Sequence, residues 1–174
     1  MDKSTILTTA EILFFGKKQN DVKLSSVARA LHIQTPSLYH WFPDKKTLLE
    51  EVILFSAKKF IQNLTLILEK NDPETTILWY LTFPSQEKNL FGVAFQKGFC
   101  EDRELRILVG KYKNDVYQKL TEHFHNHLSN DTQGYLLITL LEKLAAENCI
   151  EGYCLPQIPE NIAKEIEKIF FVKS

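Results

Sequence analysis

The sequence predicts an all-α protein, and three observations support this fold class. Apolar residues recur at intervals of three and four along nearly the whole chain, and the period-two alternation of a half-buried strand is absent. Proline or a short polar side chain opens several of these segments, as is typical of helix N-termini. The composition, 44% hydrophobic and 25% charged with six glycines among 174 residues, is that of an ordinary globular protein.

The periodic segments predict the limits of each helix. These are residues 4–15, 24–30, 35–41 or 42, 45–70, 73–84, 86–99, 102–128, 131–154 and 159–172. The first helix has one apolar stripe and stops at Gly16. The third begins where Thr35 can cap free N–H groups and Pro36 can take the first position, and it ends before Pro43.

The fourth and fifth predicted helices also have clear start signals. Asp44 is expected to cap the long fourth helix, whose buried side carries apolar residues from Leu48 to Leu68. Asp72 and Pro73 open the fifth helix, and Pro84 is expected to stop it. The later helices follow from apolar spacing alone.

The second and third helices, joined by a tight turn, have the proportions of a helix-turn-helix. Ala28 is small enough to let the two helices cross closely. A small core between them and the first helix is expected from Val27, Leu31, Ile33 and Leu38. These are the packing requirements of that motif.

Several positions in and around this motif agree with one family in order and spacing. They are Val27 and Ala28, the run IQTPSLYHWF at 33–42, Asp44 and Lys45, and Thr47 to Leu49. Together they resemble the N-terminal signature of the tetracycline-repressor (TetR) family of bacterial transcription regulators, over about residues 4 to 55. The resemblance implies a helix-turn-helix DNA-binding domain at residues 1–46. It also implies an effector-binding and dimerisation domain at residues 47–174, where the chain is similar only in helical character and length.

Two positions depart from the family pattern. His32 stands where the turn normally has glycine, so we expect a left-handed backbone conformation there. Val22 and Lys23 occupy the usual place of the Ser or Thr that opens the first short helix, so Asp21 or Ser25 is expected to cap it instead.

The resemblance implies that double-stranded DNA is bound around the second helix of the motif. The DNA-facing positions are Gln34, Thr35, Ser37, Tyr39, His40, Trp41, Lys45 and Lys46. The hydroxyls of Thr35 and Ser37 are expected near base edges. Tyr39, His40 and Lys45 resemble the family's contacts to the phosphate backbone. The alternative is that the aromatic residues of this set belong to the core and that its lysines form a solvated surface.

Charge is segregated along the chain. Between Lys17 and Lys46, six basic residues oppose two acidic ones, although the whole chain has a formal charge of −1. A local cationic patch can bind phosphates by releasing their counterions, so the near-neutral total does not exclude nucleic acid. Free N–H groups at the helix starts near Thr35 and Lys45 are expected to contribute.

The C-terminal helices carry aromatic residues that can form the effector pocket implied by the resemblance. The candidates are Phe60, Trp79, Phe83, Phe95, Phe99, Tyr112 and Tyr135. Phe91, Phe95 and Phe99 repeat every four residues, which is equally typical of a filled core, and both alternatives stay open. Basic residues are scarce among these aromatics, which favours a neutral or cationic aromatic effector.

The last two helices carry apolar residues at helical spacing. They are Leu137, Leu140, Leu141, Leu144, Ile162, Ile166, Ile169 and Phe170. Two such helices from each protomer can form a four-helix interface, so we expect a homodimer on a palindromic operator. A small apolar ligand would release this repressor by shifting the population of dimers away from the DNA-binding form.

Other function classes have less support. No nucleophile–base pair, phosphate loop or metal-ligand spacing is present, so we expect neither an enzyme nor a bound cofactor or metal. His123 and His127 could share one face of a helix, but no further metal ligand stands at a fixed spacing from them. An all-α ligand carrier or enzyme that keeps the helix-turn-helix as a scaffold is the alternative. The apolar runs are too short to span a membrane, and the opening segment does not have the pattern of a signal peptide. An odd count of three cysteines favours reduced thiols, so we expect a cytoplasmic protein.

Overall fold

The computed structural model describes residues 2–15, 21–92, 102–128, 130–148 and 158–171. Every regular element in these ranges is a helix, which confirms the predicted all-α class. The helices are α1 (Lys3–Phe15), α2 (Leu24–Ala30), α3 (Thr35–Tyr39), α4 (Lys45–Leu68), α5 (Pro73–Gln86), α7 (Arg103–His125), α8 (Asp131–Asn148) and α9 (Ile158–Phe170). Over the described part of the chain, no helix is long and apolar enough to cross a membrane.

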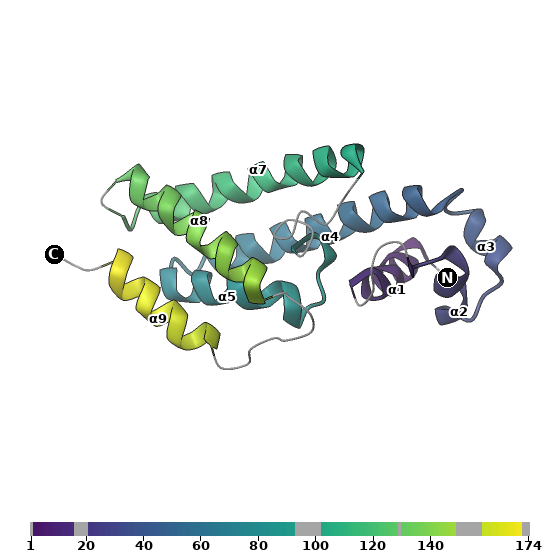
Figure 1. Cartoon of the computed structure of the whole chain (residues 1–174), viewed down its shortest axis with the longest axis horizontal. Helices are drawn as coiled ribbons and strands as arrows, with labels where there is room; N and C mark the ends of the chain where they lie inside the picture. The colour runs from purple at the N-terminus through teal and green to yellow at the C-terminus, as the bar shows by residue number, and fades with distance from the viewer. Residues whose placement is uncertain (1, 16–20, 93–101, 129, 149–157, 172–174) are drawn as a thin grey trace.

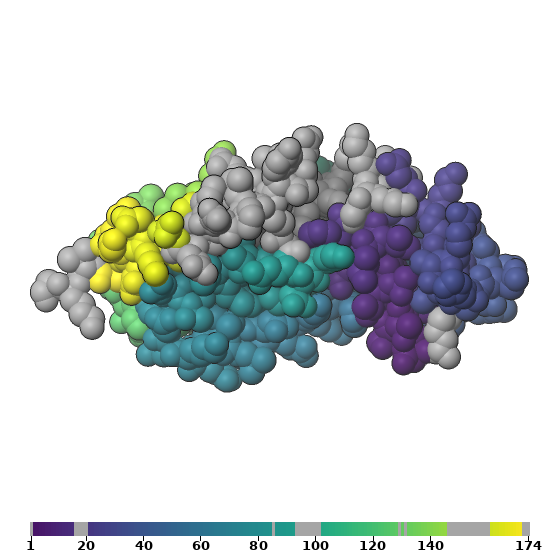
Figure 2. All heavy atoms as spheres, turned by 90° about the horizontal axis from the view of Figure 1, so that it is seen from below, coloured from purple at the N-terminus to yellow at the C-terminus, as the bar shows by residue number. Residues whose placement is uncertain are grey.

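The molecule is elongated, and its two ends are built from different helices (Figure 1). We call α1, α2, α3 and the first turn of α4 the head, and the helices from α5 to α9 the body. α4 leads from the head into the body, where it packs against α5 and α7. Figure 2 shows the same division from below, with α1 and α2 toward one end and α9 at the other.

The head is held together by a small buried core. α1 packs on α2 and α4, and α2 packs on α3. The predicted members Val27 and Leu38 are fully buried, and Leu31 and Ile33 pack against the core at its edge. This core fixes the angle between α2 and α3, as the helix-turn-helix prediction required.

Several helix ends agree with the sequence. Asp44 Oδ1 accepts the Thr47 N–H at 2.7 Å, and Asp72 Oδ2 accepts the Thr75 N–H at 3.0 Å, so both predicted N-caps are confirmed. The left-handed turn is also confirmed, because His32 has φ 56°. Around it the His32 N–H bonds the Arg29 carbonyl and the Ile33 N–H bonds the Ala28 carbonyl, which is the Schellman arrangement that ends α2.

Two predicted caps in the head are wrong. Lys23 is the N-cap of α2 and Gln34 that of α3, and neither makes a side-chain capping bond. Neither Asp21 nor Ser25 is therefore the cap of α2, and Thr35 is the first helical residue of α3 rather than its cap. Backbone bonds replace the missing caps, since the Ser26 N–H bonds the Lys23 carbonyl and the Ser37 N–H bonds the Gln34 carbonyl.

Other helix limits differ from the prediction by a few residues. α3 ends at Tyr39 and is followed by a turn, and α4 and α7 end at Leu68 and His125. Pro84 does not stop α5, which continues to Gln86, because a proline near a helix end removes only one backbone bond. The next helical turn begins at Leu90 instead of residue 86. The remainder of that predicted helix and the predicted end of α8 lie outside the described residues.

Candidate nucleic-acid interface

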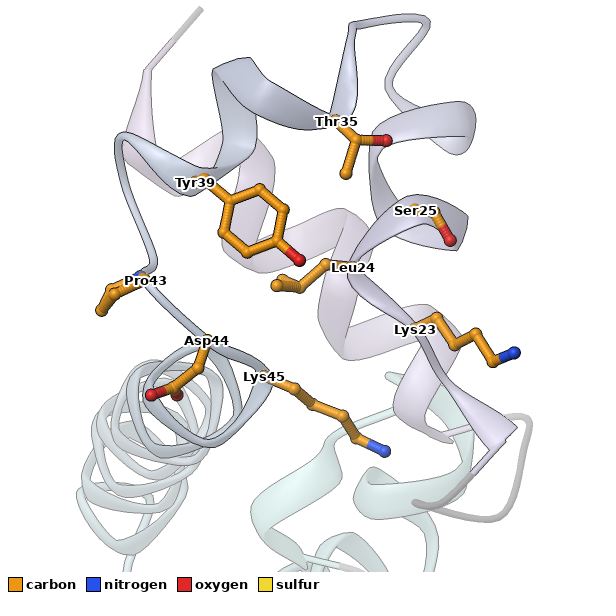
Figure 3. A pocket seen from close by; sticks show the side chains of 8 residues that line it. All are labelled: Lys23, Leu24, Ser25, Thr35, Tyr39, Pro43, Asp44 and Lys45. Carbon is orange, nitrogen blue, oxygen red and sulfur yellow. The ribbon is translucent and has the colours of Figure 1, made fainter.

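A cleft of about 390 Å³ lies on the head, between the start of α2, α3 and the start of α4 (Figure 3). It is lined by Lys23, Leu24, Ser25, Thr35, Tyr39, Pro43, Asp44 and Lys45. Two lysines, one tyrosine and two hydroxyl side chains from three separate segments therefore share one open surface. This arrangement is suited to an extended anionic ligand such as a phosphate backbone.

The buried side of α3 determines which residues face outward. Leu38 and Phe42 are fully buried, so the side chains between them point away from the core. Tyr39 is 50% exposed and Trp41 is 44% exposed. Neither ring is a core residue, and the alternative that they are core aromatics is wrong. His40 and Ser37 are exposed on the same short segment.

Figure 3 shows how the cleft residues lie. The hydroxyl end of Tyr39 points toward Leu24 at the start of α2. The side chains of Lys23 and Lys45 reach away from Tyr39. Thr35 and Ser25 line the cleft on the side of the α2–α3 turn. The structure thus brings three predicted DNA-facing residues together with Lys23 and Ser25, which the sequence did not single out as DNA contacts.

Asp44 is the one carboxylate that lines the cleft, and it is already engaged. The backbone N–H of Thr47 donates to it and, as the largest cause, lowers its pKa below the ordinary value. The first turn of α4 is therefore closed by its own cap. The expectation of free N–H groups for phosphate near Lys45 is wrong at Thr47.

Lys46 has a different environment from Lys45. It is not part of the cleft lining, and its ammonium contacts Asp102 at 3.3 Å and also Glu104, both at the start of α7. The remaining predicted residue, Gln34, is exposed just before α3. The sequence could not show the Lys46 contact, because its partners are more than fifty residues away.

Comparisons with known proteins identify the fold. No protein-family model and no curated protein sequence matches this chain. A TetR/AcrR-family transcriptional regulator from Aquifex aeolicus matches in structure with a TM-score of 0.76 and 21% identity, over 97% of this chain and 99% of that one. The fatty acid degradation regulator FadR from Bacillus halodurans matches with a TM-score of 0.73 and 12% identity, over 97% of each chain. The chain has the TetR-like fold.

Within this TetR-like fold, three of the predicted effector residues, Phe60, Trp79 and Phe83, pack together in an aromatic cluster. Phe60 is fully buried, and its ring centroid lies 5.1 Å from Trp79 and 5.6 Å from each of Phe83 and Phe91. Trp79 and Phe83 are 4.6 Å apart. Tilted and edge-on contacts of this kind are favourable between aromatic rings. Phe60 is therefore in contact with rings from α5 and from the helical turn at residues 90–92.

The other predicted effector residues are more scattered. Tyr112 on α7 reaches the cluster through Phe91, with ring centroids 6.3 Å apart. Tyr135 is 73% exposed on α8, so the expectation that it joins the buried aromatics is wrong. Its spacing in the sequence is helical, but it lies on the outer side of its helix. Phe95 and Phe99 lie outside the described residues.

The apolar residues of α8 and α9 divide into inner and outer sets. Leu137, Leu141 and Ile166 are buried in the core of their own protomer, so their assignment to a dimer interface is wrong. Leu140, Leu144, Ile162 and Phe170 are half-buried against that core. Ile169 is 70% exposed. Two other large apolar side chains of α8 are also exposed, Tyr135 at 73% and Leu136 at 53%.

His123 on α7 and His127 in the turn after it both have protein partners. His123 is buried, its Nε2 lies 3.2 Å from Thr76 Oγ1, and burial lowers its pKa. His127 Nε2 lies 3.1 Å from Asn71 Oδ1. No cluster of three His, Cys, Asp or Glu side chains suited to a metal occurs in the described ranges.

Proposed function

We propose that this protein is a homodimeric transcriptional regulator that binds double-stranded DNA through its head and acts as a repressor. The cleft carries this proposal, because it places two lysines and a tyrosine beside the exposed side of α3. The structural neighbours are both described as regulators, which supports the same class. The division into a DNA-binding head at residues 1–46 and a sensing and dimerising part at 47–174 belongs to the proposal.

The contacts within this proposal differ in what they recognise. Lys23, Tyr39 and Lys45 would hold backbone phosphates, which fix the register of the protein on DNA. Gln34 and Ser37 would then face the major groove, where a glutamine can read adenine and a hydroxyl has little base preference. The operator would be a palindrome, since a two-fold dimer presents two copies of α3.

The effector in this proposal is a small neutral or cationic aromatic molecule. The aromatic cluster around Phe60 supports it, because Phe60 is part of α4, the helix that joins body and head. A ligand that binds more tightly to a dimer whose two heads are wrongly spaced for the operator would shift the population toward that dimer. DNA affinity would then fall. The description of FadR as a fatty acid degradation regulator concerns that protein, and no effector is transferred from it.

The first test of this proposal concerns the cleft. Lys45→Ala and Tyr39→Ala should each weaken binding to DNA from upstream of the protein's own gene, about tenfold for a lost charge-assisted contact. Lys45→Ala should also reduce the slope of log K against log salt by about 0.9, because one phosphate contact is lost. Fluorescence anisotropy at several salt concentrations measures both quantities.

Lys58→Ala is a matched control for the charge change. Lys58 is an exposed lysine on α4, about 20 Å along the helix from Lys45 at 1.5 Å per residue. We expect its substitution to leave both affinity and salt slope close to wild type. Equal binding to upstream and random duplexes, with both cleft variants unchanged, would contradict the repressor proposal.

A second test concerns the dimer. The exposed apolar side chains of α8 and α9 favour a second copy of the chain as their partner in this TetR-like fold. Leu136→Glu would place a charge in that contact, so we expect the mass in light scattering to fall from twice 20.2 kDa to the monomer. Leu66→Glu, at an exposed leucine of α4, should leave the mass unchanged. A dimeric Leu136→Glu protein would exclude this surface as the interface.

A further inference from the structure

The start of α7 holds two carboxylates against the start of α4. Lys46 Nζ lies 3.3 Å from Asp102 Oδ2 and also bonds a carboxylate oxygen of Glu104. Asp102 is the N-cap of α7, and its Oδ1 accepts the Glu104 N–H at 2.8 Å and the Leu105 N–H at 3.3 Å. The Asp102 carboxylate is therefore held in place by the helix it begins.

These contacts change the charge at the edge of the head. One ammonium between two carboxylates has a net charge of −1, where the sequence alone places a cation. Lys46 directly follows Lys45, which lines the cleft. Phosphates approaching that cleft would lie within the Debye length of about 8–10 Å over which exposed charges interact at physiological salt.

We propose that Asp102 and Glu104 limit the affinity of the head for DNA by holding Lys46 on α7 in the free protein. The inference rests on the DNA-binding function proposed above. All three side chains are at least one-third exposed, and exposed ion pairs are weak, so a DNA phosphate can compete for the ammonium. Because the two carboxylates compete with the phosphate for Lys46, this lysine contributes less to DNA affinity than a free lysine would.

The experiment compares four proteins by anisotropy on a fluorescein-labelled random duplex of about 30 base pairs, roughly three helical turns. They are wild type, Asp102→Asn/Glu104→Gln, Lys46→Gln and the triple variant. A random duplex suffices, because phosphate contacts do not depend on base sequence. Asparagine keeps the N-cap of α7, and circular dichroism would verify that each variant is folded.

The double variant should bind several-fold more tightly than wild type, with a salt slope steeper by about 0.9 for one added phosphate contact. This gain should disappear in the triple variant, because it requires Lys46. A fifth protein, Glu69→Gln/Glu74→Gln, removes two carboxylates at the end of α4 and the start of α5, far from Lys46, and serves as the control for the general loss of negative charge.

Three outcomes would overturn the inference. The double variant could bind as wild type does, its gain could persist in the triple variant, or the Glu69/Glu74 control could show the same gain. In each case wild type would still bind DNA with a steep salt slope, and the proposed function would stand. Absence of duplex binding by every protein, even at low salt, would overturn both.

Discussion

Replacing Phe60 with alanine should lower the free energy of unfolding by about 3–5 kcal/mol, the usual cost of deleting a buried aromatic side chain. Phe60 is fully buried and faces rings from α5 and from the helical turn after it, at 5.1 to 6.3 Å between centroids. These rings are fixed by two different helices, so they cannot close over the space that the substitution leaves. Urea denaturation followed by circular dichroism measures the effect.

Leu66→Ala is the control on the same helix. Leu66 is largely exposed, so its truncation should change the stability by no more than about 0.5 kcal/mol. A domain has only about 5–15 kcal/mol of stability, so the Phe60 variant would lose a large share of it. If Phe60→Ala cost no more than Leu66→Ala, the aromatic cluster would be an open pocket rather than a filled core.

The sequence predicted best those features that depend on neighbouring residues. Helix periodicity, the Asp44 and Asp72 caps and the left-handed His32 each arise from interactions within about five residues, and all agree with the structure. The predicted side-chain cap of α2 is wrong, because backbone bonds alone can satisfy the first N–H groups of a helix. A residue pattern contains no signal for that alternative.

The candidate site was predictable only in part, for a related reason. Tyr39 and Lys45 lie in one short stretch whose spacing already favours a shared surface. The partners of Lys46 are on α7, and no local pattern connects them. Apolar spacing likewise shows that Leu137 is on the apolar side of α8. It does not show whether that side meets the protomer's own core or a second copy, and the structure places it in the core.

A buried polar joint between head and body could not be predicted either. The helical turn at residues 90–92 has its N–H groups bound by side chains from three segments. Leu90 N–H donates to Glu11 Oε1 at 3.1 Å, Phe91 N–H to Ser56 Oγ at 2.8 Å and Gly92 N–H to Asn89 Oδ1 at 2.8 Å. Burial raises the pKa of Glu11, and hydrogen bonds from Ser56 and Leu90 oppose that rise.

Ser56→Ala should therefore lower the free energy of unfolding by about 1–3 kcal/mol, the cost of leaving a buried donor without an acceptor. Ser56 is fully buried, and its hydroxyl is the acceptor for the Phe91 N–H. The loss of its hydrogen bond to Glu11 should also raise the pKa of that carboxyl further. Denaturation at neutral pH measures the stability change.

Thr65→Val tests whether that cost comes from the joint rather than from losing any hydroxyl of α4. The Thr65 hydroxyl donates to the Ile61 carbonyl one turn earlier, and its removal leaves no buried donor unpaired, so we expect a cost below about 1 kcal/mol. Equal costs for Ser56→Ala and Thr65→Val would mean that the joint adds nothing to stability. A larger cost for Ser56→Ala would show that the hydrogen bond between Ser56 on α4 and the turn at residues 90–92 stabilises the packing of the body on α4.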